Sequence, residues 1–253
     1  MINAKVKELI QQSLGVFGYQ IFSTKSFPID MDKKFKKIHE ECKDYTMTSV
    51  ERMYALYKAI EYVVNSNVRG DFVECGVWKG GSAMIMAKTL LKMNDAKRNI
   101  YLYDTFAGMS KPSKKDKRMF DSSDFMEIWK KKQRKEHNEL SFSPLSEVRE
   151  NMLSTKYPEK NLIFVEGKVE DTIPNKIPSK IALLRLDTDW YESTCHELKH
   201  LYPLLSHRGI LIIDDYGYCK GSKEAVDEYF KNGNPILLNR IDIAGRLGIK
   251  YTE

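Results

Sequence analysis

The sequence predicts an α/β protein built on a doubly wound, mostly parallel β-sheet. Short apolar runs of strand length alternate along the chain with helical patterns, an order typical of a parallel sheet with helices on both faces. Two of these runs, at 181–186 and 209–213, lead into acidic residues, and the run at 71–75 leads into a glycine-rich turn. Ligands bind at the carboxyl ends of the strands in such sheets, so these three segments also predict where a site lies.

The first 45 residues mix apolar positions with many lysines, and we expect residues 1–45 to form a helical appendage that acts as a lid or a dimer contact. The main domain is then expected over residues 46–253. Its first helix should run from about residue 50 to 65, because apolar residues recur there at helical spacing. Thr48 and Glu51 have the spacing of a capping box at the start of this helix.

The remaining elements follow from apolar runs and the turn residues between them. We predict strands at 71–75, 99–103, 161–165, 181–186 and 209–213, and helices near 82–92, 124–137, 145–153, 194–204 and 222–231. The tail from 235 to 251 is expected to add an antiparallel C-terminal pair to the sheet.

Composition limits the class of protein. The 253 residues are 42% hydrophobic and 30% charged, as in a globular domain, and no apolar run approaches the roughly 20 residues that span a bilayer. The four cysteines show no paired spacing, so we expect reduced thiols and a cytoplasmic location. The net charge of +6 is mild, although basic residues cluster at 111–118 and 130–135.

Acidic residues follow two of the predicted strands. They are Asp187, Asp189, Asp214 and Asp215. Two adjacent strands that deliver four carboxylates to one edge of a sheet predict a site for a hard divalent cation. A single acid at such a position more often caps the following helix, but two pairs on neighbouring strands favour a metal.

The turn after the first strand has the features of a ligand site without those of a polyphosphate site. Its glycines allow a ligand to approach the backbone, and the next helix offers free N–H groups. The spacing matches neither the dinucleotide nor the triphosphate pattern. Glu74 suits a cationic amine and Asp104 suits a ribose diol, so the segment predicts S-adenosylmethionine. The alternative is a tight turn without a ligand.

These segments resemble the macrocin O-methyltransferase (TylF-like) family, whose members methylate sugar hydroxyls of glycosylated natural products. The resemblance is carried by residues 45–48, 71–82, 103–106, 166–172, 184–194 and 212–217. It implies a class I methyltransferase (Rossmann-like) fold, with S-adenosylmethionine and Mg²⁺ or another divalent cation as cofactors. It also implies a methyl acceptor that is a sugar-containing small molecule or a glycan.

The resemblance further implies roles for individual residues. Asp187, Asp214 and Asp215 would ligate the metal, and Asp189 would be the general base. The cofactor would be held by Met47, Glu74, Gly76, Ser82, Asp104, Val169, Glu170 and Asp187. The chain departs from the family at Thr188, where glycine is common, and in the lysine-rich segment 111–135, where a substrate lid is expected.

A zinc peptidase is the sharpest alternative. Residues 196–200 read His-Glu-Leu-Lys-His, the pattern that places two imidazoles on one helix face with a glutamate base. No third ligand follows on another helix, so we expect His200 to pack or to form a hydrogen bond on the helix flank instead.

Other acceptors and partners define the remaining alternatives. The basic run at 129–135 is typical of RNA binding or of a solvated helix face, and the mild net charge favours the latter. A third possibility is that the basic loop receives a phosphorylated or acidic glycan. A catechol-type methyltransferase would place a lysine base where this chain has Trp190. Trp190 and Tyr191 are candidates for stacking on a sugar ring or for packing at the sheet edge. A homo-oligomer is compatible with the amphipathic N-terminal segment, and no membrane contact is expected.

Overall fold

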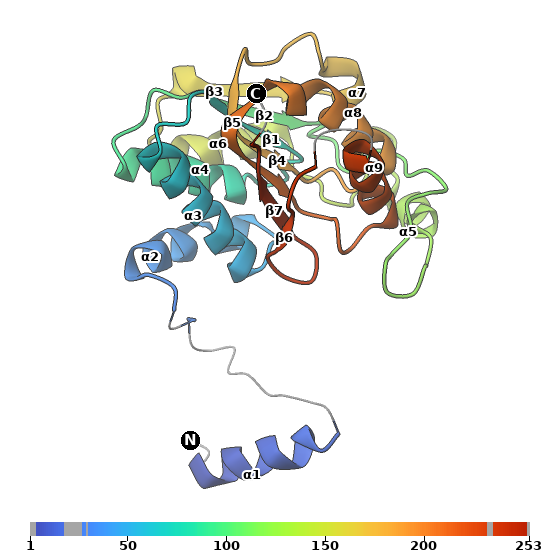
Figure 1. Ribbon diagram of the computed structural model, residues 1–253. Helices are drawn as coiled ribbons and strands as arrows, with labels where there is room; N and C mark the ends of the chain where they lie inside the picture. The colour runs from blue at the N-terminus through green and yellow to red at the C-terminus, as the bar shows by residue number, and fades with distance from the viewer. Residues whose placement is uncertain (1–3, 18–26, 29, 232–234, 252–253) are drawn as a thin grey trace. The chain divides into compact units, whose positions relative to one another are not determined.

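The computed structural model describes residues 4–17, 27–28, 30–231 and 235–251 (Figure 1). The chain divides into two compact units, Met1–Lys36 and Lys37–Glu253, so the second unit begins within helix α2 (Lys33–Cys42). The first unit contains helix α1 (Ala4–Gly15). Parts of the predicted appendage, including Ile21 and Phe22, lie outside the described residues. Its role as a lid or a dimer contact stays a prediction.

One seven-stranded sheet organises the second unit, in the order β3-β2-β1-β4-β5-β7-β6. The strands are β1 (Asp71–Cys75), β2 (Ile100–Asp104), β3 (Leu162–Glu166), β4 (Ile181–Leu186), β5 (Leu205–Ile213), β6 (Asn239–Arg240) and β7 (Arg246–Ile249). Strands β1 to β5 are parallel, whereas β7 runs antiparallel to β5 and to β6. The predicted mostly parallel sheet with an antiparallel C-terminal pair is therefore confirmed.

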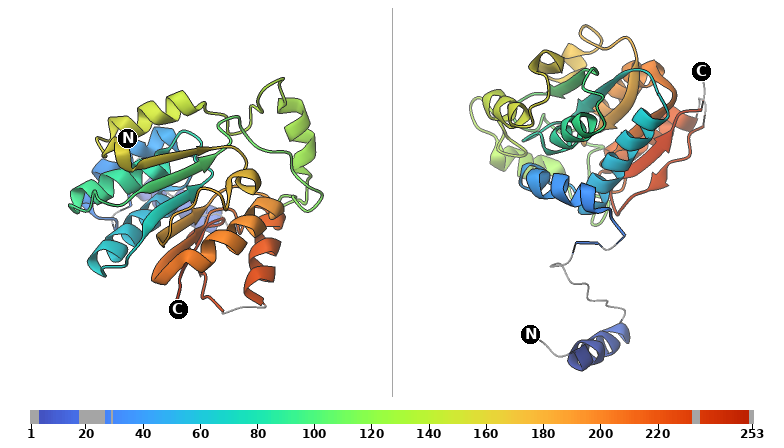
Figure 2. Two further views of the ribbon diagram at one scale, coloured as in Figure 1. Left: turned by 90° about the horizontal axis from the view of Figure 1, so that it is seen from above. Right: turned by 90° about the vertical axis from the view of Figure 1, so that its left-hand side faces the viewer.

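Helices cover both faces of the sheet (Figures 1 and 2). One face carries α3 (Val50–Asn65), α4 (Gly81–Lys92) and α6 (Leu145–Ser154), and the other carries α7 (Val169–Thr172), α8 (Tyr191–Leu201) and α9 (Lys220–Lys231). Helix α5 (Phe125–Lys132) belongs to the long connection between β2 and β3 and lies apart from both layers. The described residues also include the short 3₁₀ helices Lys43–Tyr45, Glu159–Asn161 and Tyr202–Leu204.

Several predicted boundaries are wrong. The cap of α3 is Ser49 rather than Thr48: the Ser49 hydroxyl accepts a hydrogen bond from the Arg52 N–H at 3.2 Å, so the expected capping box does not form. The helix predicted at 124–137 ends at Lys132, because Gln133 is extended and pairs with Asn138 in an isolated bridge. Helix α7 has only four residues and so presents no apolar repeat that sequence reasoning could detect.

The central strands of the sheet are buried. Every residue of β4 is buried, and its neighbours β1 and β5 are buried over nearly their whole length. All four cysteines are free thiols, with Cys42, Cys75 and Cys219 buried and Cys195 half-buried. Among the described helices, none is long and apolar enough to cross a membrane.

Candidate active site

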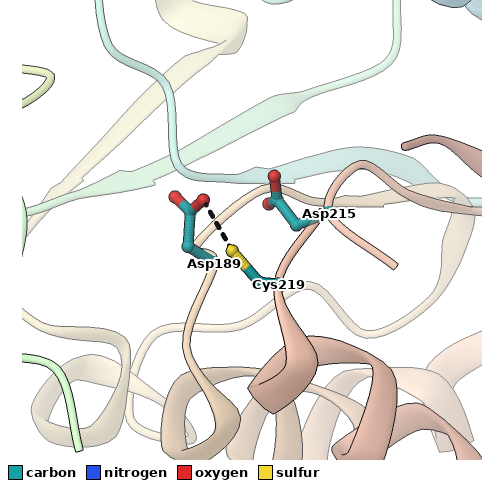
Figure 3. Close-up of side chains that lie close together, drawn as sticks. All are labelled: Asp189, Asp215 and Cys219. Atoms are coloured by element: carbon teal, nitrogen blue, oxygen red, sulfur yellow. Dashed lines mark hydrogen bonds between the residues drawn. The ribbon is translucent and has the colours of Figure 1, made fainter. Parts of the chain in front are cut away.

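The acids predicted to converge do so because β4 and β5 are parallel neighbours. Leu186 pairs with Ile213, so the residues after each strand leave the sheet at the same edge. Carboxylate oxygens of Asp187, Asp214 and Asp215 lie within 4.8 Å of one another. Asp189 and Asp215 form a second group with the thiol of Cys219, again within 4.8 Å (Figure 3). The structure thus brings four carboxylates to one edge.

A cavity of about 650 Å³ opens over this edge and contains most of the predicted site residues. Those on its wall are Met47, Gly76, Ser82, Asp104, Val169, Glu170, Asp187, Asp189, Asp214 and Asp215. They come from the ends of β1 to β5 and from the segment before α3, so one cavity unites the residues assigned to cofactor, metal and catalysis.

Glu74 is the exception, because it lies below the cavity rather than on its wall. Its side chain is fully buried, and Glu74 Oε1 accepts a hydrogen bond of 2.6 Å from Arg185 Nη1. Burial raises the pKa of Glu74 to about 7, an effect that Arg185 opposes. Its other oxygen, Oε2, has no hydrogen-bond partner. The structure therefore places Glu74 beside Arg185 and not beside the space open to a ligand.

Arg185 is a functional residue that sequence reasoning missed. It is 3% exposed, and its Nη2 lies 2.8 Å from Asp187 Oδ2 and 2.7 Å from Asp214 Oδ1. One guanidinium therefore joins acids from β1, β4 and β5. The available signal was a lone arginine in an otherwise apolar strand, a residue type that is almost never fully buried unless it is paired.

Arg52, from the first turn of α3, is the second missed residue. It forms an ion pair with Asp214, and its Nε lies 3.0 Å from Asp242 Oδ2. Asp242 also accepts a hydrogen bond of 2.7 Å from the Ser49 hydroxyl. This network links the start of α3 to the loop before β7. Nothing in the spacing of α3 distinguishes Arg52 from an ordinary exposed helical arginine.

The site holds more negative than positive charge. Five acids meet there, Glu74, Asp187, Asp189, Asp214 and Asp215, and among the described residues two arginines pair with them, Arg52 and Arg185. Burial raises the pKa of Asp187 and of Asp215, and neighbouring acids raise both further. Clustered carboxylate oxygens with uncompensated charge are the donor set that a hard divalent cation prefers, so the residues present fit such an ion.

Asp189 has an unusual backbone conformation and a carboxyl pKa close to neutral pH. Its φ of 65° lies in the left-handed region, which non-glycine residues rarely adopt and which often marks functional sites. Burial raises the pKa of Asp189 to about 7, and nearby Asp187 adds to the effect. The Cys219 thiol donates to Asp189 Oδ1 over 3.5 Å (Figure 3). A carboxylate with this pKa is suited to accept a proton at neutral pH.

The side chain of Asp104, at the end of β2, holds the turn that follows β1. Its carboxylate accepts backbone N–H hydrogen bonds from Val77 at 2.7 Å, Trp78 at 3.0 Å and Phe106 at 2.8 Å. Gly76 has a φ of 85°, and a Cβ there would lie 1.9 Å from the Asp187 carbonyl oxygen. Glycine is therefore required by the close approach of β1 to β4. The ribose contact assigned to Asp104 stays a prediction.

The contacts of the zinc-peptidase pattern at residues 196–200 are those of side chains packed in the protein. His196 Nε2 lies 2.9 Å from the Ile173 carbonyl oxygen, and Glu197 is fully buried with its Oε1 accepting a 2.9 Å hydrogen bond from the Thr188 hydroxyl. In the described part of the chain, neither His196 nor His200 belongs to a group of three metal-binding side chains. These contacts do not favour the zinc alternative, and Glu197 instead contacts the loop that carries the acids.

The two aromatic residues after Asp189 have different positions. Trp190 lies on the cavity wall, is 4% exposed, and donates from Nε1 to the Ser110 carbonyl at 3.0 Å. Tyr191 is not on the wall: its hydroxyl donates to Glu228, and Lys115 Nζ lies 3.4 Å from its ring centroid. Of the two, only Trp190 is placed to contact a ligand in this cavity.

The sheet order is that of the class I S-adenosylmethionine-dependent methyltransferase fold. The chain belongs to the family described as Macrocin-O-methyltransferase (TylF), which it matches over residues 6–247. It is therefore an O-methyltransferase.

Curated relatives are also named as O-methyltransferases. The chain is 34% identical over 73% of its length to an 8-demethyl-8-(2,3-dimethoxy-alpha-L-rhamnosyl)-tetracenomycin-C 4'-O-methyltransferase from Streptomyces olivaceus, covering 67% of that protein. It is 31% identical over 88% of its length to a mycinamicin III 3''-O-methyltransferase from Micromonospora griseorubida, covering 86%. Among solved structures, the O-methyltransferase NovP aligns with a TM-score of 0.72 at 26% identity, over 98% of this chain and 99% of that one.

Proposed function

We propose that this O-methyltransferase transfers the methyl group of S-adenosylmethionine to a hydroxyl of a sugar-containing metabolite, with Mg²⁺ or another divalent cation. The convergence of Asp187, Asp214 and Asp215 within 4.8 Å, on the wall of the cavity that also contains the glycine-rich turn, carries the proposal. Relatives named for methylation of a rhamnosyl tetracenomycin and of mycinamicin support a sugar-containing acceptor.

Residues that follow or end β1, β2 and β3, together with Met47 before α3, would hold the cofactor. They are Met47, Gly76, Ser82, Asp104, Val169 and Glu170, all on the cavity wall. Helix α4 starts at Gly81, so its free N–H groups face the same region and suit a carboxylate. The cofactor, when bound, supplies a methyl group already activated by its positive sulfur. The chain then has to orient the acceptor rather than to generate a leaving group.

The acidic edge would hold the cation. Asp187, Asp214 and Asp215 are the candidate ligands, and Arg185 fixes the first two through its Nη2. When bound, the cation would stabilise the negative charge that develops on the acceptor oxygen. Arg52 and Arg185 also reduce the repulsion among these acids, which keeps them together before any cation binds.

Asp189 would act as the general base. A sugar hydroxyl is a weak acid, so its proton must be removed as the new C–O bond forms. Asp189 is on the cavity wall, two residues after Asp187, and its raised pKa suits proton uptake near neutrality. Trp190 occupies the position where a catechol-type enzyme would have a lysine, and an indole cannot accept this proton. The geometry therefore favours a carboxylate base.

The test is methyl transfer to a panel of glycosides by metal-stripped protein, measured as release of S-adenosylhomocysteine. We expect turnover of at least one glycoside on addition of Mg²⁺ and its loss with excess chelator. Full turnover in chelator would contradict the metal role. Turnover of catechols or RNA, without turnover of any glycoside, would contradict the sugar acceptor. The cytoplasmic location and a homo-oligomeric state stay predictions.

A further inference from the structure

We propose that the methyl acceptor is an anionic saccharide, and that Arg118 binds its carboxylate or phosphate group. This inference rests on the proposed function, because it assigns the acceptor end of the same cavity. It identifies a residue in the lysine-rich segment 111–135 that reaches the site, and it names the chemistry that the residue would recognise.

Backbone hydrogen bonds hold the segment that carries Arg118 beside the acidic edge of the sheet. The Met119 N–H donates to the Tyr218 carbonyl at 2.9 Å, and the Lys220 N–H donates to the Lys117 carbonyl at 2.9 Å. Arg118 and Cys219 face each other in this antiparallel bridge. Cys219 in turn donates to Asp189, the proposed base. Arg118 is therefore placed on the cavity wall by a fixed strand-like segment that is tied to the start of α9.

Arg118 differs from the other cationic residues on the wall, which are Arg52, Lys168 and Arg185. Arg52 and Arg185 form ion pairs with the site acids, and Lys168 is an exposed residue before α7. In the part of the chain that the structure describes, Arg118 has no carboxylate within 4.0 Å. Its guanidinium instead lies 5.7 Å from the Phe125 ring centroid. Arg118 is thus a half-buried wall cation without a direct ion pair, and its charge adds to the backbone hydrogen bond that lowers the pKa of the exposed Asp121 carboxyl.

An aromatic cluster that includes Phe125, the ring next to Arg118, lies on the same cavity wall. The Phe125 ring lies 5.1 Å from Trp190 and 6.0 Å from Tyr218, and Phe120 lies 6.1 Å from Tyr218, as centroid distances. All four rings are on the cavity wall. Aromatic faces suit the apolar face of a sugar ring, and a planar guanidinium suits the paired oxygens of a carboxylate or phosphate. Together they fit a sugar that bears an anionic group.

The charge of the flanking segment supports an anion. Exposed Lys111, Lys114 and Lys117 precede Arg118, and the one acid of residues 111–118 is Asp116. Asp116 is fully buried, where it accepts hydrogen bonds from the Ser113 and Tyr191 N–H groups at 2.6 and 2.8 Å. The segment therefore presents mainly positive charge, which raises the local concentration of an anionic acceptor.

The test uses protein loaded with S-adenosylhomocysteine and Mg²⁺, and follows tryptophan fluorescence, since Trp78 and Trp190 are on the wall. Methyl glucuronide, glucose 1-phosphate and methyl glucoside are titrated into the wild type, Arg118→Gln and the control Lys117→Gln, which removes a neighbouring positive charge that is not on the wall. We expect at least one anionic sugar to bind the wild type, and Arg118→Gln to weaken it by roughly tenfold to a hundredfold, the effect of losing a hydrogen bond to a charged group. Lys117→Gln should change the affinity by less than about threefold, as expected for an exposed charge.

Each result of this titration decides the question. Stronger binding of glucuronide or of phosphate identifies the source of the anion. Three results would overturn the proposal. The two variants could bind the anionic sugars with equal affinity, the wild type could bind methyl glucoside more tightly than either anionic sugar, or it could bind neither anionic sugar. Binding of an RNA oligonucleotide that both variants weaken alike would also overturn it, because the basic face would then bind nucleic acid. S-adenosylhomocysteine affinity is measured in parallel, and its absence would count against the proposed function instead.

Discussion

Arg185 is the residue on which the acidic site depends most directly. Its guanidinium contacts Glu74, Asp187 and Asp214, and none of these contacts is open to solvent on the arginine side. Burying an ion is costly, so the guanidinium is stable there because it is paired with these acids. Removing it leaves Glu74 and Asp187 without a counter-charge, whereas Asp214 keeps its ion pair with Arg52.

We therefore expect Arg185→Met to lower the free energy of unfolding by about 3–5 kcal/mol, the usual cost of breaking a buried ion pair from one side. Urea unfolding of metal-free protein measures this value. The control is Arg149→Met, which removes an exposed arginine 3.5 Å from Glu159 and should cost less than about 1 kcal/mol. Equal losses in the two variants would show that Arg185 is not the centre of the site.

Asp189 supports a second prediction at the same scale. Asp189→Asn keeps the shape of the side chain but removes the proton acceptor, so the methyl-transfer rate should fall by about 10²–10⁴. Binding of S-adenosylhomocysteine and Mg²⁺ should remain, since the proposed ligands are untouched. Asp227→Asn, an exposed change on α9, serves as the control. A variant at 189 with an unchanged rate would remove Asp189 from the mechanism.

At the scale of elements, the loop after β4 controls where the acids point. Thr188 separates Asp187 from Asp189, and its hydroxyl donates to Glu197 of α8 at 2.9 Å. The other oxygen of Glu197 has no hydrogen-bond partner. The Thr188–Glu197 contact ties the loop that carries the acids to helix α8.

Thr188→Val removes the hydroxyl at nearly constant volume and leaves the buried Glu197 carboxyl without its donor. We expect a loss of about 1–3 kcal/mol in the free energy of unfolding. Ser154→Ala, which removes an exposed hydroxyl bonded to the Asn151 carbonyl, should cost less than about 0.5 kcal/mol. If the two variants have the same stability, the Thr188–Glu197 contact does not support the loop.

The elements also show what the sequence could and could not predict. The positions of the main strands and the acidic edge followed from apolar runs and the residues after them, because burial in a parallel sheet leaves that pattern. Arg52 and Arg118 could not be predicted as site residues, because each contacts a segment far away in the sequence. Arg52 pairs with Asp214, 162 residues later, and Arg118 forms a bridge with Cys219. The pairing of Glu74 could not be predicted for the same reason: its partner Arg185 lies on another strand.

For the whole molecule, the buried acids predict how stability depends on pH. Burial raises the pKa of Glu74 from 4.5 to about 7, and it raises that of Glu197 as well. Between these values the folded protein binds more protons than the unfolded chain, so its stability falls as pH rises. Carboxyls whose pKa is lowered, such as Glu61, are ionised in both states in this range and contribute no slope.

Metal-free protein should therefore have a lower free energy of unfolding at pH 7.5 than at pH 5. The decrease should be smaller in Glu74→Gln, which has no proton to lose, and unchanged in the control Glu150→Gln, an exposed position on α6. Urea unfolding at the two pH values measures both slopes. A wild type that gains stability over this range would contradict the burial assigned to these acids.

The central claim is that one cavity binds S-adenosylmethionine and a divalent cation side by side. Calorimetric titration of S-adenosylhomocysteine and then Mg²⁺ into metal-stripped protein, repeated with Asp215→Asn, tests it most directly. We predict micromolar binding of S-adenosylhomocysteine to both proteins, and Mg²⁺ binding to the wild type that is at least about tenfold weaker in the variant, because a carboxylate ligand is lost. Folded wild-type protein that binds neither ligand, or a variant that binds Mg²⁺ as tightly as the wild type, would contradict the account.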